Sequence, residues 1–291
     1  MAISRHQLVK ELEPGLNALF GLEYNRYDNQ HAEIYTSESS DRAFEEEVML
    51  SGFGNASVKS EGSGVAFDNA QESYSARYTH ETVALAFAIT EEAIEDNLYD
   101  RISSRYTKAL ARSMSNTKQV KAAAPLNNGL PSVDGFDSGD GVSLFNTSHT
   151  TVSGTSVKNT LSTQADLNET SLEQAMIDIS GMTDERGLRI AAKAVKMIVP
   201  SANQFQAERL MKSQGRVGTA DNDINALGSM GMIPQGYRVN NFLTDTDSFY
   251  IITDVPNGMK MFTRAPLTTA MEGDFDTGNV RYKARERYSF G

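Results

Sequence analysis

The first residues form a polar segment in which apolar side chains recur at helical spacing. Within residues 1–42, four leucines lie three or four positions apart: Leu8, Leu12, Leu16 and Leu19. This spacing predicts a short amphipathic helix, and Pro14 with Gly15 argues against a long one. A polar segment with one apolar stripe needs another surface to lie on, so we expect an arm.

Between residues 43 and 89 the period becomes alternating. Larger apolar or aromatic side chains occupy every second position in two runs: Tyr74, Ala76 and Tyr78, then Val83, Leu85, Phe87 and Ile89. Each run predicts a strand, and the second, which alternates with alanines, predicts one covered on both faces. We expect a long two-stranded β-excursion with a Gly- and Ser-rich tip. Because an isolated hairpin is marginal in water, a neighbouring molecule should hold it.

Residues 90–122 predict the longest helix. Apolar residues recur at every fourth position: Ile94, Leu98, Ile102, Tyr106, Leu110 and Met114. Thr90 suits an N-cap, and Pro125 with Asn127–Gly129 suits a stop. About 30 residues give a helix of roughly 45 Å. The narrow stripe predicts that it buries one side only.

The following residues predict a mixed α/β domain after a loop-rich stretch at 123–168. The pattern predicts helices over 169–186 and 200–215 and strands over 194–199, 238–243 and 249–252. The α+β class follows from this mixture.

The last segment, 280–291, alternates cations with other residues. Arg281, Lys283, Arg285 and Arg287 occupy one parity, and Tyr282, Ala284, Glu286 and Tyr288 occupy the other. A strand would place the four cations on one face. That face is either solvated, paired with acids of a neighbouring strand such as Glu45–Glu47, or a patch that touches nucleic acid or an acidic partner chain.

Composition limits the class of protein. The 291 residues carry a formal net charge of −11 at pH 7. Proteins that grip nucleic acid are normally basic, so such contact would need a local basic patch. The chain has no cysteine, which excludes disulfides and thiolate metal sites. The N-terminus lacks a signal-peptide pattern and no run of about 18 apolar residues occurs. We expect a soluble protein made and used in a cytoplasm.

Residue types suited to metal binding lack the spacing that such sites need. The histidines are His6, His31, His80 and His149, and none lies four positions from another. His80–Ala84 begins like the zinc motif HExxH but lacks the second histidine. Asp134, Asp137 and Asp140 are spaced by three, unlike an EF-hand. We expect a partly exposed histidine on a strand and a flexible acidic loop.

Catalytic patterns are equally incomplete. A hydrolase that uses Ser148 and His149 is one alternative, but adjacent residues rarely form a nucleophile–base pair and no third member is evident. The phosphate-binding loop, the dinucleotide fingerprint and the nucleophile elbow are missing. We therefore expect no enzyme, with no catalytic residue, cofactor or metal.

The order of the predicted elements and several short sequence motifs resemble those of one family. The motifs are Ser143–His149, Ile198–Ser201, Ala207–Leu210, Asn222–Asn225, Leu243–Tyr250, Phe262–Pro266 and Arg285–Gly291. These segments are similar to those of HK97-type major capsid proteins of tailed bacteriophages, in particular Mu-like and related head subunits. They recur in the same order over most of the chain.

That resemblance implies a domain plan and a function. It implies an N-terminal arm at 1–42, an E-loop at 43–89, a P-domain spine helix at 90–124, an A-domain at 125–262 and P-domain terminal strands at 263–291. The chain would self-assemble into hexamers and pentamers of an icosahedral or prolate shell around phage DNA. The alternative is an encapsulin-like shell of a cellular nanocompartment.

The resemblance also implies partners. We expect a homo-oligomer, a separate scaffolding protein because few residues precede the β-excursion, a portal protein, a possible decoration protein and non-specific contact with packaged DNA, but no membrane. The protein would reside in the virion capsid after assembly in the host bacterial cytoplasm. The residues expected at inter-subunit contacts are Glu45, Glu46, Glu47, Lys59, Arg77, Arg281, Lys283, Arg285 and Arg287.

Overall fold

The chain folds into two compact units, each built from separate stretches of sequence. The computed structural model describes residues 5–90, 92–93, 99–133, 135–216, 223–274 and 277–291, and for 5–12 and 99–102 the backbone alone. The first unit contains Met1–Glu45, Tyr78–Ala122 and Lys260–Gly291, and the second contains Glu46–Arg77 and Ala123–Met259.

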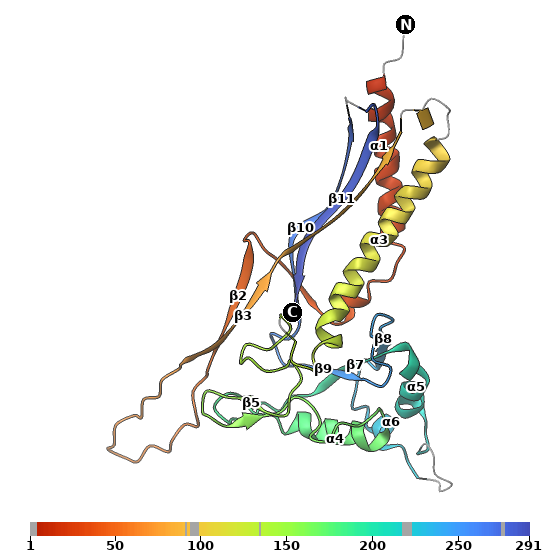
Figure 1. Ribbon diagram of the computed structural model, residues 1–291. Coiled ribbons are helices and arrows are strands. Elements are labelled where there is room, and N and C mark those ends of the chain that lie inside the picture. Colours follow the sequence, from red (N-terminus) through yellow and green to blue (C-terminus); the bar gives the residue numbers. More distant parts are fainter. Residues whose placement is uncertain (1–4, 91, 94–98, 134, 217–222, 275–276) are drawn as a thin grey trace. The chain divides into compact units, whose positions relative to one another are not determined.

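The first unit is built on a four-stranded sheet with the order β1–β10–β11–β4. The strands are β1 (Thr36–Ser39), β4 (Glu81–Ile89), β10 (Lys260–Gly273) and β11 (Val280–Phe290). Strand β1 runs parallel to β10, and β11 runs antiparallel to both of its neighbours. Strand β11 therefore has an interior position, between β10 and β4 (Figure 1).

Two long helices, α1 (Arg5–Tyr24) and α3 (Tyr99–Asn127), cover one face of this sheet (Figure 1). A 3-10 helix, η1 (Gln30–Glu33), follows α1. The core between the layers contains Leu16, Phe20, Leu110, Ala111, Met114, Tyr282 and Ala284. The predicted arm helix thus lies on the sheet of its own chain.

Helix α1 runs through Pro14, so the prediction of a short helix was wrong. A proline inside a helix removes one backbone hydrogen bond and costs roughly 3 kcal/mol. Pro14 and Gly15 are exposed, whereas Leu16 and Phe20 are 5% and 2% exposed. Burial of such side chains stabilises by roughly 1.5–3 kcal/mol each. Tertiary packing therefore outweighs the local preference.

Helix α3 was predicted, but its predicted apolar stripe is only partly buried. Tyr106 is 54% exposed, while Leu110 and Met114 are 4% and 1% exposed. A series of every fourth residue turns by about 40° per step around a helix with 3.6 residues per turn, so it leaves the buried side. The buried residues instead recur in every turn and include polar side chains: Ser103, Thr107, Leu110, Ala111, Met114, Ser115, Gln119, Ala122, Ala123, Pro125 and Leu126. The helix passes Pro125 and ends at Asn127.

Several side chains of the predicted stripes cannot be compared. Outside the described side chains lie Leu8, Leu12, Ile94, Leu98 and Ile102, and also Asp134 and Asn222.

Strand β4 confirms the predicted alternation but not the predicted cover on both faces. Val83 and Phe87 pack at the edge of the helical core, and Ile89 is buried. The other face carries the alanines Ala84, Ala86 and Ala88, which are exposed in this chain. Strand β4 pairs with β11, so it belongs to the sheet of the first unit and not to the two-stranded excursion.

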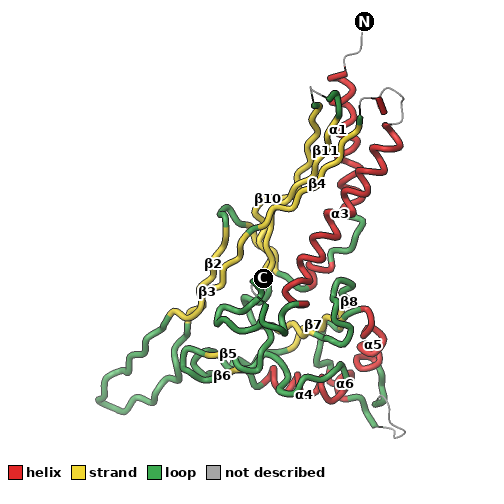
Figure 2. Tube along the Cα trace, viewed as in Figure 1, coloured by secondary structure: helices red, strands yellow, loops and turns green. Residues whose placement is uncertain are grey.

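That excursion is the ribbon of β2 (Phe44–Leu50) and β3 (Glu72–Thr79), which pair only with one another among the described strands. Residues 51–71 connect them without helix or strand (Figure 2). Val58 and Phe67 in this connection are each 97% exposed. A ribbon with a Gly- and Ser-rich tip was predicted correctly, but it ends at Thr79 and not at residue 89.

The second unit contains a three-stranded sheet with the order β8–β7–β9. Its elements are β5 (His149–Thr150), β6 (Ser156–Val157), α4 (Glu169–Ser180), β7 (Ala194–Val199), η2 (Ser201–Asn203), α5 (Gln204–Lys212), α6 (Ala226–Met230), β8 (Tyr237–Val239) and β9 (Tyr250–Thr253). Strand β7 is buried at Met197, Ile198 and Val199. The bounds of β7 match the prediction, and the loop-rich stretch before α4 is confirmed.

Helix α4 ends six residues earlier than predicted. Its start is fixed by a capping box, in which the side chain of Asn168 accepts a hydrogen bond from the N–H of Ser171. After Ser180 the chain turns back, with a bridge between Thr183 and Arg189. Gly187, with a φ of 82°, serves this turn and not a helix end.

Among the described helices, none is long and apolar enough to cross a membrane.

We predict that Met114→Ala destabilises the first unit by about 2–5 kcal/mol, because Met114 is 1% exposed in the core between helices and sheet. The matched control is Val120→Ala in the same helix, where the side chain is 50% exposed. It should change the free energy of unfolding by less than about 0.5 kcal/mol. Chemical denaturation measures both, and equal losses would contradict this packing.

Candidate functional site

Strand β11 has two chemically opposite faces. Tyr282, Ala284, Glu286 and Tyr288 are 1%, 0%, 2% and 2% exposed on the face that packs against the helices. On the other face Arg281, Lys283 and Arg285 are exposed and Arg287 is half-buried. The four cations thus share one face of the sheet, as their alternation predicted.

Small residues flank this cationic face. In register with Arg281, Lys283 and Arg285 are Ala88, Ala86 and Ala84 on β4. On β10 the small residues Ala270 and Thr268 are in register with Lys283 and Arg285, and Glu272 is in register with Arg281. Alternate residues of a strand lie about 7 Å apart. The charged groups therefore stand above a low surface, which suits contact with a broad acidic partner.

The cationic face has little internal compensation. Arg281 pairs with Asp274. Lys283 and Arg285 form no ion pair with any carboxylate among the described residues. Since unpaired surface charges are well solvated, they cost little in the isolated chain and are available to a partner.

The other predicted contact residues lie on the ribbon and its base. Glu46 pairs with Arg77 at 3.2 Å, and both side chains are exposed. Glu45 accepts a hydrogen bond from Ser40 Oγ at 2.6 Å. Glu47 is half-buried, and Lys59 is exposed in the 51–71 connection. The acidic run is thus occupied within its own ribbon and its base, with the carboxylate of Glu46 still accessible.

Beneath the cationic face, the buried carboxylate of Glu286 joins three elements. Its Oε2 accepts hydrogen bonds from Lys118 Nζ of α3 at 3.3 Å and from Tyr24 Oη of α1 at 3.4 Å. Lys118 Nζ also lies 5.2 Å from the centre of the Tyr288 ring, a cation–π geometry. A buried ion pair adds little net stability, but breaking one half leaves an uncompensated charge. It therefore fixes which helical residues face β11.

Burial dominates the protonation equilibria of this cluster. Burial raises the pKa of Glu286 above its ordinary value of 4.5, and Lys118 and the Tyr24 hydroxyl reduce that rise only in part. Burial and the neighbouring carboxylate raise the pKa of Tyr24 and of Tyr288 as well. Glu286 Oε1 has no hydrogen-bond partner among the described residues.

His80 connects the ribbon base to the sheet. It lies between β3 and β4, and its Nδ1 is 3.0 Å from Ser289 Oγ while its Nε2 is 2.9 Å from Ser40 Oγ. It is 5% exposed, so the expectation of a partly exposed histidine was wrong. Burial and then the charge of Arg287 lower its pKa. A neutral imidazole thus holds two hydroxyl groups in place.

The residues of the alternative hydrolase do not form a triad. His149 Nδ1 lies 2.8 Å from Asp140 Oδ2, so an acid partner that the sequence did not reveal is present. Ser148 Oγ, however, bonds to Ser156 Oγ at 2.8 Å. The Asp140–His149 pair instead ties the acidic loop to β5. Within the described ranges, no three His, Cys, Asp or Glu side chains cluster as a metal site.

The sequence interpretation missed the role of Glu286. A signal was present, because Glu286 alternates along the strand in step with Tyr282, Ala284 and Tyr288 and must therefore lie on the same buried face. Its partners Lys118 and Tyr24 lie on other elements and could not be found from the local pattern.

Comparison with known proteins gives one family. A family model described as phage capsid protein matches residues 73–291. A search of curated proteins found no match.

Solved structures match at low sequence identity. The capsid of bacteriophage JBD30 decorated with minor capsid protein trimers is 11% identical, covers 75% of this chain and 92% of that chain, and gives a TM-score of 0.54. The capsid of Myoviridae phage XM1 is 13% identical, with 89% and 85% covered and a TM-score of 0.48. A virus-like particle from Pyrococcus furiosus is 11% identical, with 94% and 92% covered and a TM-score of 0.48. The first of these likenesses shows the fold.

We predict that Glu286→Gln changes how stability depends on pH. Because the pKa of Glu286 is raised in the folded state, its contribution is fully present below the ordinary value of 4.5 and is lost as pH rises through the folded pKa. Glutamine cannot ionise. The free energy of unfolding of the wild type minus that of the variant should therefore fall as pH rises.

Urea denaturation between about pH 4 and pH 8 measures this difference. The matched control is Glu272→Gln at an exposed position of β10. It should alter the free energy of unfolding by less than about 0.5 kcal/mol. A difference for Glu286→Gln that is constant over the whole range would contradict the assignment.

Proposed function

The chain belongs to the phage capsid protein family, and on that premise we propose how its surfaces build a shell. It is a major capsid protein with the HK97-type fold, and its copies associate into a capsid. We assign it to hexamers and pentamers that enclose phage DNA. Closed shells of one protein need ring-closing contacts within each ring and symmetric contacts between rings.

The exposed ribbon is the observation that carries this proposal. Strands β2 and β3 pair only with one another among the described strands, and an isolated pair is marginal in water. Apolar side chains in the connection, Val58 and Phe67, are almost fully exposed. In an assembly, a second copy would cover them. The ribbon is therefore best understood as an arm that lies on a neighbouring subunit, which is the role expected of the E-loop, whereas residues 81–89 of the expected range 43–89 belong to the sheet of the first unit.

The remaining domain plan follows the same logic. We assign 1–42 to the arm, 90–124 to the spine helix and 263–291 to terminal strands of a P-domain, and 125–262 to an A-domain. Two compact units of interleaved sequence support a division into two domains. In this plan β4 completes the P-domain sheet by pairing with β11.

The cationic face and the acidic ribbon base are complementary surfaces. Lys283 and Arg285 lack carboxylate partners among the described residues, and Glu46 keeps 42% of its side chain exposed. We propose that the acidic run of one subunit, with Arg77 beside it, approaches the β11 face of the next. Such charge contacts set the register and the rate of association more than its strength.

Partners outside the shell protein itself remain proposals of the same kind. A scaffolding protein, a portal protein, a possible decoration protein and packaged DNA are expected, with assembly in the host bacterial cytoplasm. Lys59 is exposed, so we propose that it contacts a neighbouring subunit without a covalent cross-link, because an isopeptide bond needs a lysine that burial activates. The family is structural, so we propose no catalytic role for Asp140 and His149. The likeness to Mu-like subunits stays a prediction.

The nanocompartment alternative shares the fold but differs in cargo. The family match favours a phage shell. A nanocompartment protein would form small particles without scaffold and around an enzyme, so the content of purified particles distinguishes the two.

We predict that the protein, alone or with its scaffold, forms shells visible by electron microscopy, and that Val58→Ser with Phe67→Ser lowers their yield at least about tenfold. Loss of two apolar anchors should cost each contact more than about 1.4 kcal/mol, which is a factor of ten. The control is that the thermal midpoint of the subunit stays unchanged, because both side chains are exposed. A monodisperse wild-type monomer under all conditions would refute the function.

We also predict that Lys283→Glu with Arg285→Glu prevents shell formation, because the reversed charges would face carboxylates. Lys283→Gln with Arg285→Gln should give an intermediate yield. The matched control is Arg189→Glu with Lys193→Glu, two reversals at exposed loop positions of the second unit. Light scattering and microscopy of the purified proteins measure the yield. Wild-type shells from the reversed β11 variant would rule out this contact.

A further inference from the structure

Helix α3 is rich in cations, and those that do not contact the sheet form a second cationic surface. Over residues 103–127 it has five cations and no carboxylate: Arg105, Lys108, Arg112, Lys118 and Lys121. The chain as a whole has 38 acids in 291 residues, so a segment of this length would carry about three at the average frequency. An acid-free segment is therefore notable in a protein of net charge −11.

The five cations divide into two groups with different surroundings. Lys118 pairs with the buried Glu286, and Lys121 pairs with Glu81 of β4. These two help to attach the helix to the sheet. Three others are exposed and form no ion pair with a carboxylate of the described residues: Arg105, Lys108 and Arg112. They are three and four positions apart, so they form one stripe along the helix.

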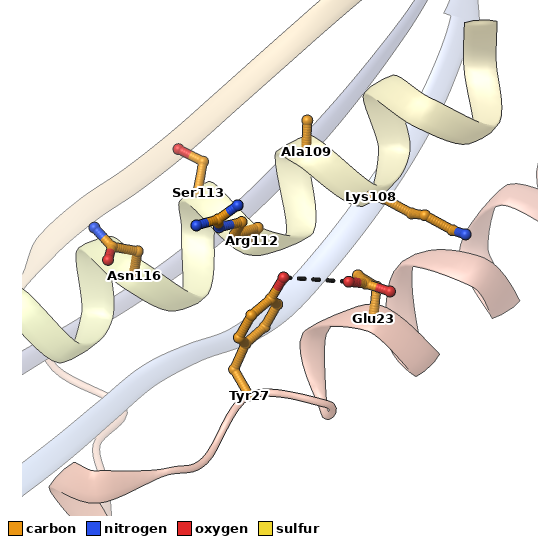
Figure 3. A pocket seen from close by; sticks show the side chains of 7 residues that line it. All are labelled: Glu23, Tyr27, Lys108, Ala109, Arg112, Ser113 and Asn116. Carbon is orange, nitrogen blue, oxygen red and sulfur yellow. Dashed lines mark hydrogen bonds between the residues drawn. The ribbon is translucent and has the colours of Figure 1, made fainter.

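A groove between α3 and the end of α1 borders this stripe (Figure 3). Its lining is polar or charged except for one alanine: Glu23, Tyr27, Lys108, Ala109, Arg112, Ser113 and Asn116. Glu23 already accepts a hydrogen bond from Tyr27 Oη at 3.2 Å and lies 3.6 Å from Arg26. The single carboxylate is therefore compensated locally, and the groove remains cationic.

The chemistry of this surface fits a phosphate backbone better than a protein. Protein contacts depend on buried apolar or aromatic anchors, and the groove offers only Ala109 and the edge of Tyr27. Arg and Lys together with Ser, Asn and Tyr are the side chains that bind phosphate oxygens. Arg105 to Arg112 spans roughly 10 Å of helix. One DNA strand carries a phosphate about every 3.4 Å along the axis, so three cations match about three phosphates.

We propose that the Arg105–Lys108–Arg112 stripe and its groove bind the phosphate backbone of packaged DNA, without reading sequence, so that the helical side of the first unit faces the interior of the shell. The opposite side, with the β11 cations, is left for contact between subunits. This inference rests on the proposed function, which makes DNA the polyanion that the shell encloses.

The first test compares lysine reactivity in DNA-filled and empty shells. Acetylation of Lys108 should be at least about fivefold slower in filled shells, because a bound phosphate shields the ammonium. Lys283 on the sheet face is the internal control and should react equally in both. If Lys108 reacts fast in both particles, nothing shields it and the proposal is overturned. If it reacts slowly in both, a protein surface and not DNA covers the groove, and the proposal is overturned as well.

The second test uses the dissociated subunit and a short duplex DNA of arbitrary sequence. The variant Arg105→Gln, Lys108→Gln and Arg112→Gln should reduce the slope of log Kd against log salt by about 2.7, because each phosphate contact contributes about 0.9. The matched control, Arg189→Gln, Lys193→Gln and Arg209→Gln, removes the same number of charges, two arginines and one lysine, at exposed positions of the second unit and should leave the slope unchanged. An equal loss in both variants would show that net charge alone matters and would refute the stripe.

The two tests separate this inference from the proposed function. If shells form but Lys108 is not protected by DNA, the inference fails and the capsid function stands. If no shells form, the capsid function fails, and the duplex-binding experiment still decides whether the stripe binds phosphate. Thermal midpoints of both triple variants should equal that of the wild type, since all six side chains are exposed.

Discussion

A shift of one residue in β11 would exchange its two faces, burying three or four cations and exposing two tyrosines. Two sets of contacts prevent such a slip. Tyr282 and Ala284 fill the core under the helices, and Glu286 is hydrogen-bonded by Lys118 and Tyr24. The register of β11 in turn sets those of β4 and β10, which pair with it. The first unit, with its cationic sheet face on one side and its helical face on the other, depends on this alternation.

The sequence predicted those helices and strands that a short run of neighbouring residues determines. Strands β7 and β11 and the β2–β3 ribbon follow from short periodic runs. The errors arose where tertiary packing decides. Helix α1 tolerates Pro14 because Leu16 and Phe20 are buried against residues of α3 and β11, which lie far away in the sequence. The α3 stripe was misplaced because a fixed step of four drifts around a helix, so Tyr106 was counted as buried. The alanine face of β4 was counted as covered, whereas in the single chain it is exposed.

The candidate surfaces divide in the same way. The four cations of β11 could be found from their alternation in the sequence, and the acid-free stretch of α3 from its composition, since each is a property of a single segment. The buried position of Glu286 could be found from parity, but not its link to Lys118 and Tyr24. The Asp140–His149 pair joins the acidic loop to β5, and no spacing rule describes it. Contacts between different elements thus mark the limit of inference from the sequence of one chain.

The interior position of β11 also governs when the protein can fold. During synthesis β4 emerges early, yet its partner in the sheet follows only after residues 90–279 have been made. Until then the core under α1 and α3 lacks Tyr282 and Ala284. A ribosome that stalls before β11 therefore releases a chain whose first unit cannot close. The strand order thus makes closure of the first unit wait for the synthesis of β11.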